Sequence, residues 1–373
     1  DSLQITCIVP ANLEAVCNGN LRREKYISDK QKAFTWFVSY PINLYNVTFY
    51  IGKYTHLRDD LTYSDGSHLD LDYYVMPYNE MKARQQFEQV KPMLLCYEKY
   101  LGKYPFMRDG YALVESPYLG MEHQSAIAYG NKYKSGYDGH DYSQMGLLFD
   151  YIIIHESGHE WWGNNVSCSD MADMWIHESF CTYTESIFVE CNFGKDKAIQ
   201  YINSQKKRVK NEAPIQGVVG SNREGSGDMY AKGSLMLNSL RSVINNDTLW
   251  WNIVKGIQDS FKLKTVSAED IIGYFNEKAQ RNLTPIFKQY LKYGRLPKLH
   301  YSVKKVGIKD YELSCHWEAD VPDFNMPVIV EADGQKVFVL AKVGEVSKQI
   351  FRLKNPSSFT LKPDLTYYDF VSE

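Results

Sequence analysis

The sequence lacks a long hydrophobic run, a basic segment and a paired-cysteine motif. Its longest strongly apolar stretch, Tyr151-Ile152-Ile153-Ile154, covers one helical turn, whereas a membrane-spanning helix needs about 18 apolar residues or more. We therefore expect no membrane span. Lys and Arg number 42 against 45 Asp and Glu, for a net charge of −3. This balance disfavours nucleic-acid binding, because that affinity rests on many basic contacts to phosphate.

Cysteine is sparse and irregularly spaced. The seven cysteines form no CxxC pair, and their number is odd. A disulfide framework is therefore not expected, and the thiols are predicted to be free and buried. The chain begins Asp1-Ser2 rather than with Met, as a processed or truncated product would, so the missing leader does not assign a compartment.

The residue patterns indicate a multidomain α+β protein. At roughly 100–200 residues per domain, 373 residues suggest two or three domains. β-Branched and aromatic runs dominate residues 1–57, and short runs separated by turn signals such as Asp333-Gly334 fill 298–373, which predicts a small β-sandwich. Between them, residues 58–80 look like connecting loop and strand, and the mainly helical pattern begins near Met81. Helices are expected at 81–101 and near 142–163, 170–191, 196–211, 228–244, 248–260, 268–280 and 284–293.

One segment has the spacing of a metal site. His155 and His159 flank Glu156 in the pattern HExxH, and residues four apart share one helix face, so two imidazoles there can bind one Zn²⁺. A catalytic zinc usually takes a third protein ligand. Glu178, with eighteen residues between it and His159, is the predicted third ligand. Glu185, two turns further along, is predicted to accept the N–H of a ligating histidine.

This donor set predicts hydrolysis with one zinc ion as cofactor. Bound zinc lowers the pKa of water toward about 7 and polarises a carbonyl. Glu156 is placed to reach the water rather than the metal, and is the predicted general base. The developing oxyanion needs a further donor, for which Tyr230 is one candidate among 29 tyrosines.

These motifs resemble the M1 family of gluzincin aminopeptidases, the group that includes aminopeptidase N. The resemblance covers essentially the whole chain. HExxH, eighteen residues and then Glu is the family's zinc signature, and Trp175–Phe180 resembles its WLNEGF-type segment with His177 in place of Asn. The resemblance implies the remainder of an N-terminal β domain over 1–57, a thermolysin-like zinc catalytic domain over 58–297 and a β-sandwich over 298–373.

The resemblance also implies substrate-binding residues. The family's GAMEN motif appears as Leu119-Gly120-Met121-Glu122-His123. Its glutamate maps to Glu122, which implies capture of a free α-amino group, with Gly120 and Met121 beside it. Tyr230 matches the family's transition-state tyrosine. The segment Gln124–Tyr129 is expected to pair with the substrate backbone.

Three departures from the family pattern carry expectations of their own. Leu119 and His123 replace the first Gly and the last Asn of GAMEN, which points to a changed first-residue pocket or loop. The family's other amine-binding Glu or Gln would precede residue 1. Either the chain is an N-terminally truncated fragment, or amine binding rests on Glu122 alone.

The predicted function is therefore a zinc-dependent aminopeptidase acting on peptides with a free N-terminus. Two alternatives predict different behaviour. A zinc-stabilised peptide-binding module, or a poorly active fragment, would hold metal with little turnover. A thermolysin-like endopeptidase would cleave N-blocked peptides as fast as free ones.

Overall fold

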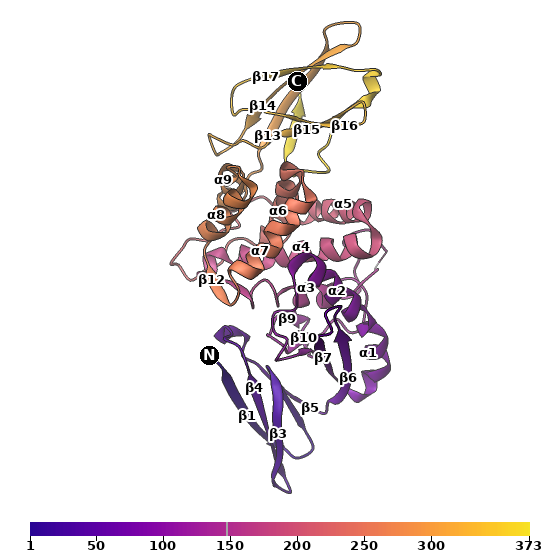
Figure 1. Ribbon diagram of the computed structural model, residues 1–373, viewed down its shortest axis with the longest axis vertical. Coiled ribbons are helices and arrows are strands. Elements are labelled where there is room, and N and C mark those ends of the chain that lie inside the picture. Colours follow the sequence, from indigo (N-terminus) through magenta and orange to yellow (C-terminus); the bar gives the residue numbers. More distant parts are fainter. Residues whose placement is uncertain (147) are drawn as a thin grey trace. The chain divides into compact units, whose positions relative to one another are not determined.

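The structure is a computed structural model that describes every residue except Leu147. Leu147 belongs to the predicted helix 142–163 and its apolar run, so this one position of the prediction lies outside the described residues. The architecture is mixed α+β (Figure 1). The chain forms two compact units that alternate along the sequence. The first comprises 1–167, 184–195 and 258–265, and the second 168–183, 196–257 and 266–373.

The first unit begins with antiparallel strands, as predicted for residues 1–57. β1 (Leu3–Pro10), β4 (Gln31–Val38) and β3 (Asn20–Ser28) form one sheet in that order, and β2 (Glu14–Cys17) pairs with β5 (Phe49–Gly52). Phe34 and Trp36 of β4 lie in the buried core of this part. The Trp36 indole N–H donates to the Ala15 carbonyl at 3.0 Å, so the ring is buried without losing its hydrogen bond.

A five-stranded sheet follows in the same unit, in the order β6-β7-β8-β10-β9. The hairpin of β6 and β7 lies where connecting loop and strand were expected. The solvent face of β6 is charged, and its two buried leucines are Leu57 and Leu61. The strands are β6 (Thr55–Thr62), β7 (His68–Val75), β8 (Tyr111–Glu115), β9 (Gly120–Met121) and β10 (Ile127–Tyr129).

The sheet corrects the expectation for Gln124–Tyr129. Only Ile127–Tyr129 forms a strand, and β10 pairs with β8 on one side and with β9 on the other. Its backbone groups are therefore used within the sheet. Among the described strands, the edge on this side of the sheet is β9.

Helices α1 (Glu80–Gln86) and α2 (Val90–Leu101) divide the predicted helix 81–101, with a 3₁₀ turn at Phe87–Gln89 between them. A disulfide joins Cys96 of α2 to Cys191 in helix α4 (Trp175–Phe193). The expectation of free thiols is therefore wrong for this pair. The two cysteines are 95 residues apart, and such a pairing leaves no local spacing signal.

The second unit holds most of the predicted helices, with ends within a few residues of expectation except for the helix predicted at 196–211, which ends at Ser204 and is followed by a 3₁₀ turn at Gln205–Arg208. In order they are α5 (Lys195–Ser204), α6 (Ala231–Ile244), α7 (Asp247–Ser260), α8 (Ala268–Ala279) and α9 (Thr284–Lys292). Ser267 caps α8, its hydroxyl accepting from the Asp270 N–H in a capping box, which fixes that start. Among the described residues, no helix is both long and apolar enough to cross a bilayer.

The C-terminal part of the second unit contains two sheets (Figure 1). One has the order β17-β14-β13-β19 and the other β16-β15-β18. Trp317 is fully buried and donates to the Met326 carbonyl at 2.9 Å. The strands are β13 (Lys298–Lys305), β14 (Asp310–Glu318), β15 (Val328–Ala332), β16 (Gln335–Val339), β17 (Ser347–Arg352), β18 (Phe359–Leu361) and β19 (Asp369–Ser372).

Candidate metal centre

The HExxH segment lies on a short helix, α3 (Tyr151–Gly158), and not on the long helix 142–163 that was predicted. Two aspartates explain the late start. Asp141 accepts hydrogen bonds from Ser143 and Gly146 and so competes with helix formation. Asp150 caps α3, accepting from the backbone N–H groups of Ile152 and Ile153.

The cap is itself buried and held from several sides. Asp150 accepts from Gln86, Tyr129 and Asn131, each at 2.7 Å. Burial raises the pKa of this carboxyl to about 6. The Tyr97 hydroxyl of α2 donates to the Ile154 carbonyl at 2.8 Å. These contacts fix the position of the helix that carries the two histidines.

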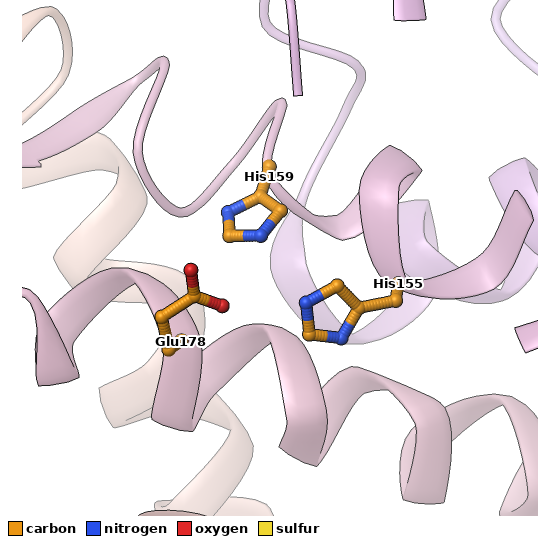
Figure 2. Close-up of side chains that lie close together, drawn as sticks. All are labelled: His155, His159 and Glu178. Carbon is orange, nitrogen blue, oxygen red and sulfur yellow. The ribbon is translucent and has the colours of Figure 1, made fainter. Parts of the chain in front are cut away.

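The structure brings His155, His159 and Glu178 together, as predicted. One ligand atom of each lies within 4.8 Å of those of the other two. Glu178 lies in the first turn of α4. In Figure 2 the two imidazole rings and the carboxylate point toward a common centre.

Hydrogen bonds set the tautomer of both histidines. The Nδ1 atom of His159 lies 2.9 Å from the Trp162 carbonyl, and that of His155 lies 2.9 Å from Glu185 Oε1. Both partners are acceptors, so each Nδ1 carries a proton, and in the neutral ring the lone pair is then on Nε2. This is the tautomer in which imidazole binds a metal through Nε2. The Nε2 atoms face the Glu178 carboxylate in Figure 2.

The charge of the cluster also fits a cation. The glutamates at 122, 156, 178 and 185 are all at least nine-tenths buried, and buried carboxylates need a compensating charge. His155 and His159 bind a metal in their neutral form and then contribute no charge of their own. A divalent ion with nitrogen and oxygen ligands would supply the missing positive charge, and zinc prefers this donor set.

A second cluster lies against the first. Glu122, Glu156 and His159 also place one ligand atom each within 4.8 Å of one another. Gly120 lies so close to Glu156 that an added Cβ would be 2.6 Å from its Oε1. A side chain at this position would therefore displace the Glu156 carboxylate. Met121, the next residue of β9, pairs with Ala128 of β10.

Sequence reasoning missed two residues that hold the Glu122 loop. The Asn164 amide donates to the Glu122 carbonyl at 3.1 Å. Glu160, which is fully buried, accepts from the Ser125 N–H at 2.7 Å, and burial raises the pKa of its carboxyl to about 8. Both lie within five residues after HExxH, but only the fold shows that they contact the Glu122 loop, which lies about 40 residues earlier in the sequence.

The two histidines that depart from the family pattern have structural contacts. The His123 ring lies 2.6 Å from the Tyr50 hydroxyl, and burial lowers the pKa of this imidazole. His177 Nε2 accepts from the Cys168 N–H at 2.8 Å. Neither belongs to the groups of the described residues that bring metal-binding atoms together around His159.

Tyr230 lies at the start of α6, and two contacts hold this start. The Ser179 hydroxyl donates to the Met229 carbonyl at 2.7 Å, which links the residue after Glu178 to the residue before Tyr230. The Lys232 ammonium donates to the carbonyls of Tyr293 and Gly294 at 2.8 and 2.6 Å.

Replacement of Gly233 by alanine is expected to destabilise the protein by about 1–3 kcal/mol, as overpacking of a close contact does. An added Cβ would lie 1.8 Å from the Ser179 hydroxyl, so α6 and Tyr230 would have to move. Chemical denaturation measures the change. Gly273→Ala in α8 is the matched control, because no atom lies within 4 Å of its added Cβ, and it should be neutral or stabilising. Equal effects of the two changes would refute the assigned contact.

Comparisons with known proteins point to one peptidase family. A profile of the peptidase family M1 domain matches residues 85–290. A leucyl aminopeptidase from Saccharolobus solfataricus is 22% identical over 351 residues, which are 90% of this chain and 43% of that protein. The chain thus spans less than half the length of this relative.

Two solved structures show the same fold. Legionella pneumophila aminopeptidase A, in complex with aspartic acid, superposes with a TM-score of 0.81 at 15% identity, covering 100% of this chain and 45% of that one. An M1 zinc metallopeptidase mutant from Deinococcus radiodurans, bound to a Tyr-Ser-Ala substrate, gives 0.62 at 17% identity, covering 78% and 63%.

Proposed function

Because this chain belongs to peptidase family M1, we propose that it is a zinc-dependent aminopeptidase, which hydrolyses the first peptide bond of substrates with a free N-terminus. One observation carries the proposal. A carboxylate oxygen of Glu122 lies within 4.8 Å of a carboxylate oxygen of Glu156 and of a ring nitrogen of His159. The group that would bind the substrate's amine is therefore beside the group that would act on its first peptide bond.

The metal would be one zinc ion held by His155, His159 and Glu178. When bound, it supplies a Lewis acid and lowers the pKa of water. Glu185 keeps the His155 ring in the metal-binding tautomer through their 2.9 Å hydrogen bond. Glu156, the glutamate of HExxH, lies near His159 but is not one of the three predicted ligands.

The proton steps fall to Glu156. Its carboxylate accepts a proton from the attacking water and donates it to the leaving amine. The α-amino group of a substrate is separated from its first scissile carbonyl carbon by a single Cα. An ammonium paired with Glu122 therefore places that carbonyl next to Glu156, and an internal residue has no ammonium to offer.

Tyr230 and strand β9 complete the proposed site. The Tyr230 hydroxyl would donate to the oxyanion of the tetrahedral intermediate. Gly120 and Met121 form the outer strand on their side of the five-stranded sheet, so we assign backbone pairing with the substrate to β9 rather than to 124–129. His123, close to Glu122 and bonded to Tyr50, would shape the first-residue pocket.

We also propose the finer domain division. Residues 1–57 would be the remainder of an N-terminal β domain, 58–297 a thermolysin-like catalytic domain and 298–373 a small β-sandwich. The family match over 85–290 falls within the second range. The two-sheet topology of β13–β19 supports the third.

The test of the function is a pair of peptides that differ only at the N-terminus. A free-amine peptide should be hydrolysed, and its N-acetylated form should be cleaved at least about 100-fold more slowly, since acetylation removes the charge that Glu122 binds. Glu122→Gln should lower kcat/KM for the free peptide about 10- to 100-fold, which corresponds to the about 1.5–3 kcal/mol of a hydrogen bond to a charged group.

Glu269→Gln is the control, because Glu269 is exposed on α8, and it should leave both rates unchanged. Equal cleavage of free and blocked peptides would instead identify an endopeptidase. Zinc binding without turnover of either peptide would identify a binding module.

A further inference from the structure

A second group of side chains that could bind a metal lies at the C-terminal sheet, on strands β13 and β14 and directly after β19. His300 of β13 is directly opposite His316 of β14 in the antiparallel register, and Val371 of β19 is its parallel neighbour. Glu373 follows Val371 by two residues and so lies on the same face. Leu299 and Trp317, the fully buried pair next to the histidines, belong to the other face.

The side chains are arranged for chelation. The rings of His300 and His316 are nearly parallel, at 9° with centroids 4.8 Å apart. One ligand atom each of His300, His316 and Glu373 lies within 4.8 Å of the other two. Two imidazoles and a carboxylate suit divalent ions of the zinc class, whereas calcium and magnesium prefer oxygen alone.

A fourth residue orients the first ligand. His300 Nδ1 lies 3.0 Å from Glu373 Oε1, and its Nε2 lies 3.0 Å from Glu318 Oε2. With Nδ1 facing the cluster, Nε2–H would donate to Glu318. This is the carboxylate–histidine arrangement that typically supports metal ligands.

We propose that this face of the sandwich binds one divalent transition-metal ion of the zinc class, through His300, His316 and Glu373, with Glu318 orienting His300. In a metal-free ion-pair cluster, a protonated His300 would lie between Glu318 and Glu373, and His316 would only stack on its ring. The aligned pairing of two imidazoles across adjacent strands is what favours the metal. Glu373 is about half exposed, so water completes the coordination, and the ion links three strands without a catalytic role.

The experiment is equilibrium dialysis of the full chain against buffered Zn²⁺ at pH 7.5, with metal analysis of the retained protein. The wild type should hold one zinc more per chain than either His300→Gln or His316→Gln. His68→Gln is the control, because His68 is exposed on β7 and its ring bonds the nearby Thr62, and it should match the wild type. The result is read from the difference in zinc content between variants and not from the total zinc content, because the cluster around His159 is expected to bind zinc as well.

A further variant leaves all three ligands in place. Glu318→Gln should weaken the extra zinc about 10- to 100-fold, as loss of a carboxylate behind a metal-bound histidine does, with an unchanged melting temperature in the absence of metal. Equal zinc content in the wild type and both folded histidine variants would overturn the proposal. If either histidine variant fails to fold, equal zinc affinity in the wild type and in Glu318→Gln would overturn the proposal instead. Neither measurement depends on peptidase activity.

Discussion

Replacing Glu156 by glutamine is expected to lower kcat about 10²- to 10⁴-fold, the usual contribution of a positioned general base, while the zinc content stays at the wild-type level. Glutamine keeps the size of the side chain but cannot accept the proton of the attacking water. The metal ligands are untouched, because the predicted set is His155, His159 and Glu178. The measurements are the steady-state rate on a free-amine peptide and metal analysis of the same sample.

The control for this variant is Glu190→Gln, a change of the same kind near the far end of α4, which should leave the rate and the zinc content unchanged. A wild-type rate for Glu156→Gln would remove the general-base role. Loss of zinc in that variant would show that Glu156 contributes to metal binding, and the proposed division between ligands and base would then be wrong.

Replacing Glu178 by alanine is expected to remove both metal and activity. Loss of a residue that only orients a ligand typically costs 10- to 100-fold in metal affinity, so loss of a ligand should cost more than about 100-fold. Without the Glu178 carboxylate, His155 and His159 are the only two remaining ligands of the proposed set. Chelator competition measures the affinity, and hydrolysis at a fixed free zinc concentration measures the activity.

Raising the zinc concentration separates a binding defect from a folding defect in Glu178→Ala. If the variant is folded, part of the activity should return at high zinc, because Glu156 and Glu122 are still in place. Wild-type zinc affinity in this variant would contradict the assignment of Glu178 as a ligand.

The grouping of His155, His159 and Glu178 could be predicted from sequence because its signal is local. HExxH and the helix period place His155 and His159 on one face, and Glu185 was found by its two-turn spacing from Glu178 along α4. The contacts that hold this centre were not predictable in the same way. Asn164 and Glu160 reach the Glu122 loop, and their partners are fixed only when α3 packs against the five-stranded sheet.

Strand errors follow from the same physical cause. The β6–β7 region is expected from sequence only as connecting loop and strand, because charged residues occupy one face of a half-exposed hairpin and strand propensity depends on that context. The pairing partners of β10 depend on the sheet order, which no single segment encodes. The Cys96–Cys191 disulfide joins two helices far apart in the sequence and is likewise a property of the tertiary fold.

The most direct test of the metal centre is an anomalous difference map at the zinc edge, from crystals of the zinc-loaded protein. We predict a peak about 2.0–2.2 Å from His155 Nε2, His159 Nε2 and a Glu178 oxygen, with Glu156 outside the ligand set. A map without a peak at these residues, or with zinc held by Glu122 and Glu156 instead, would contradict the account.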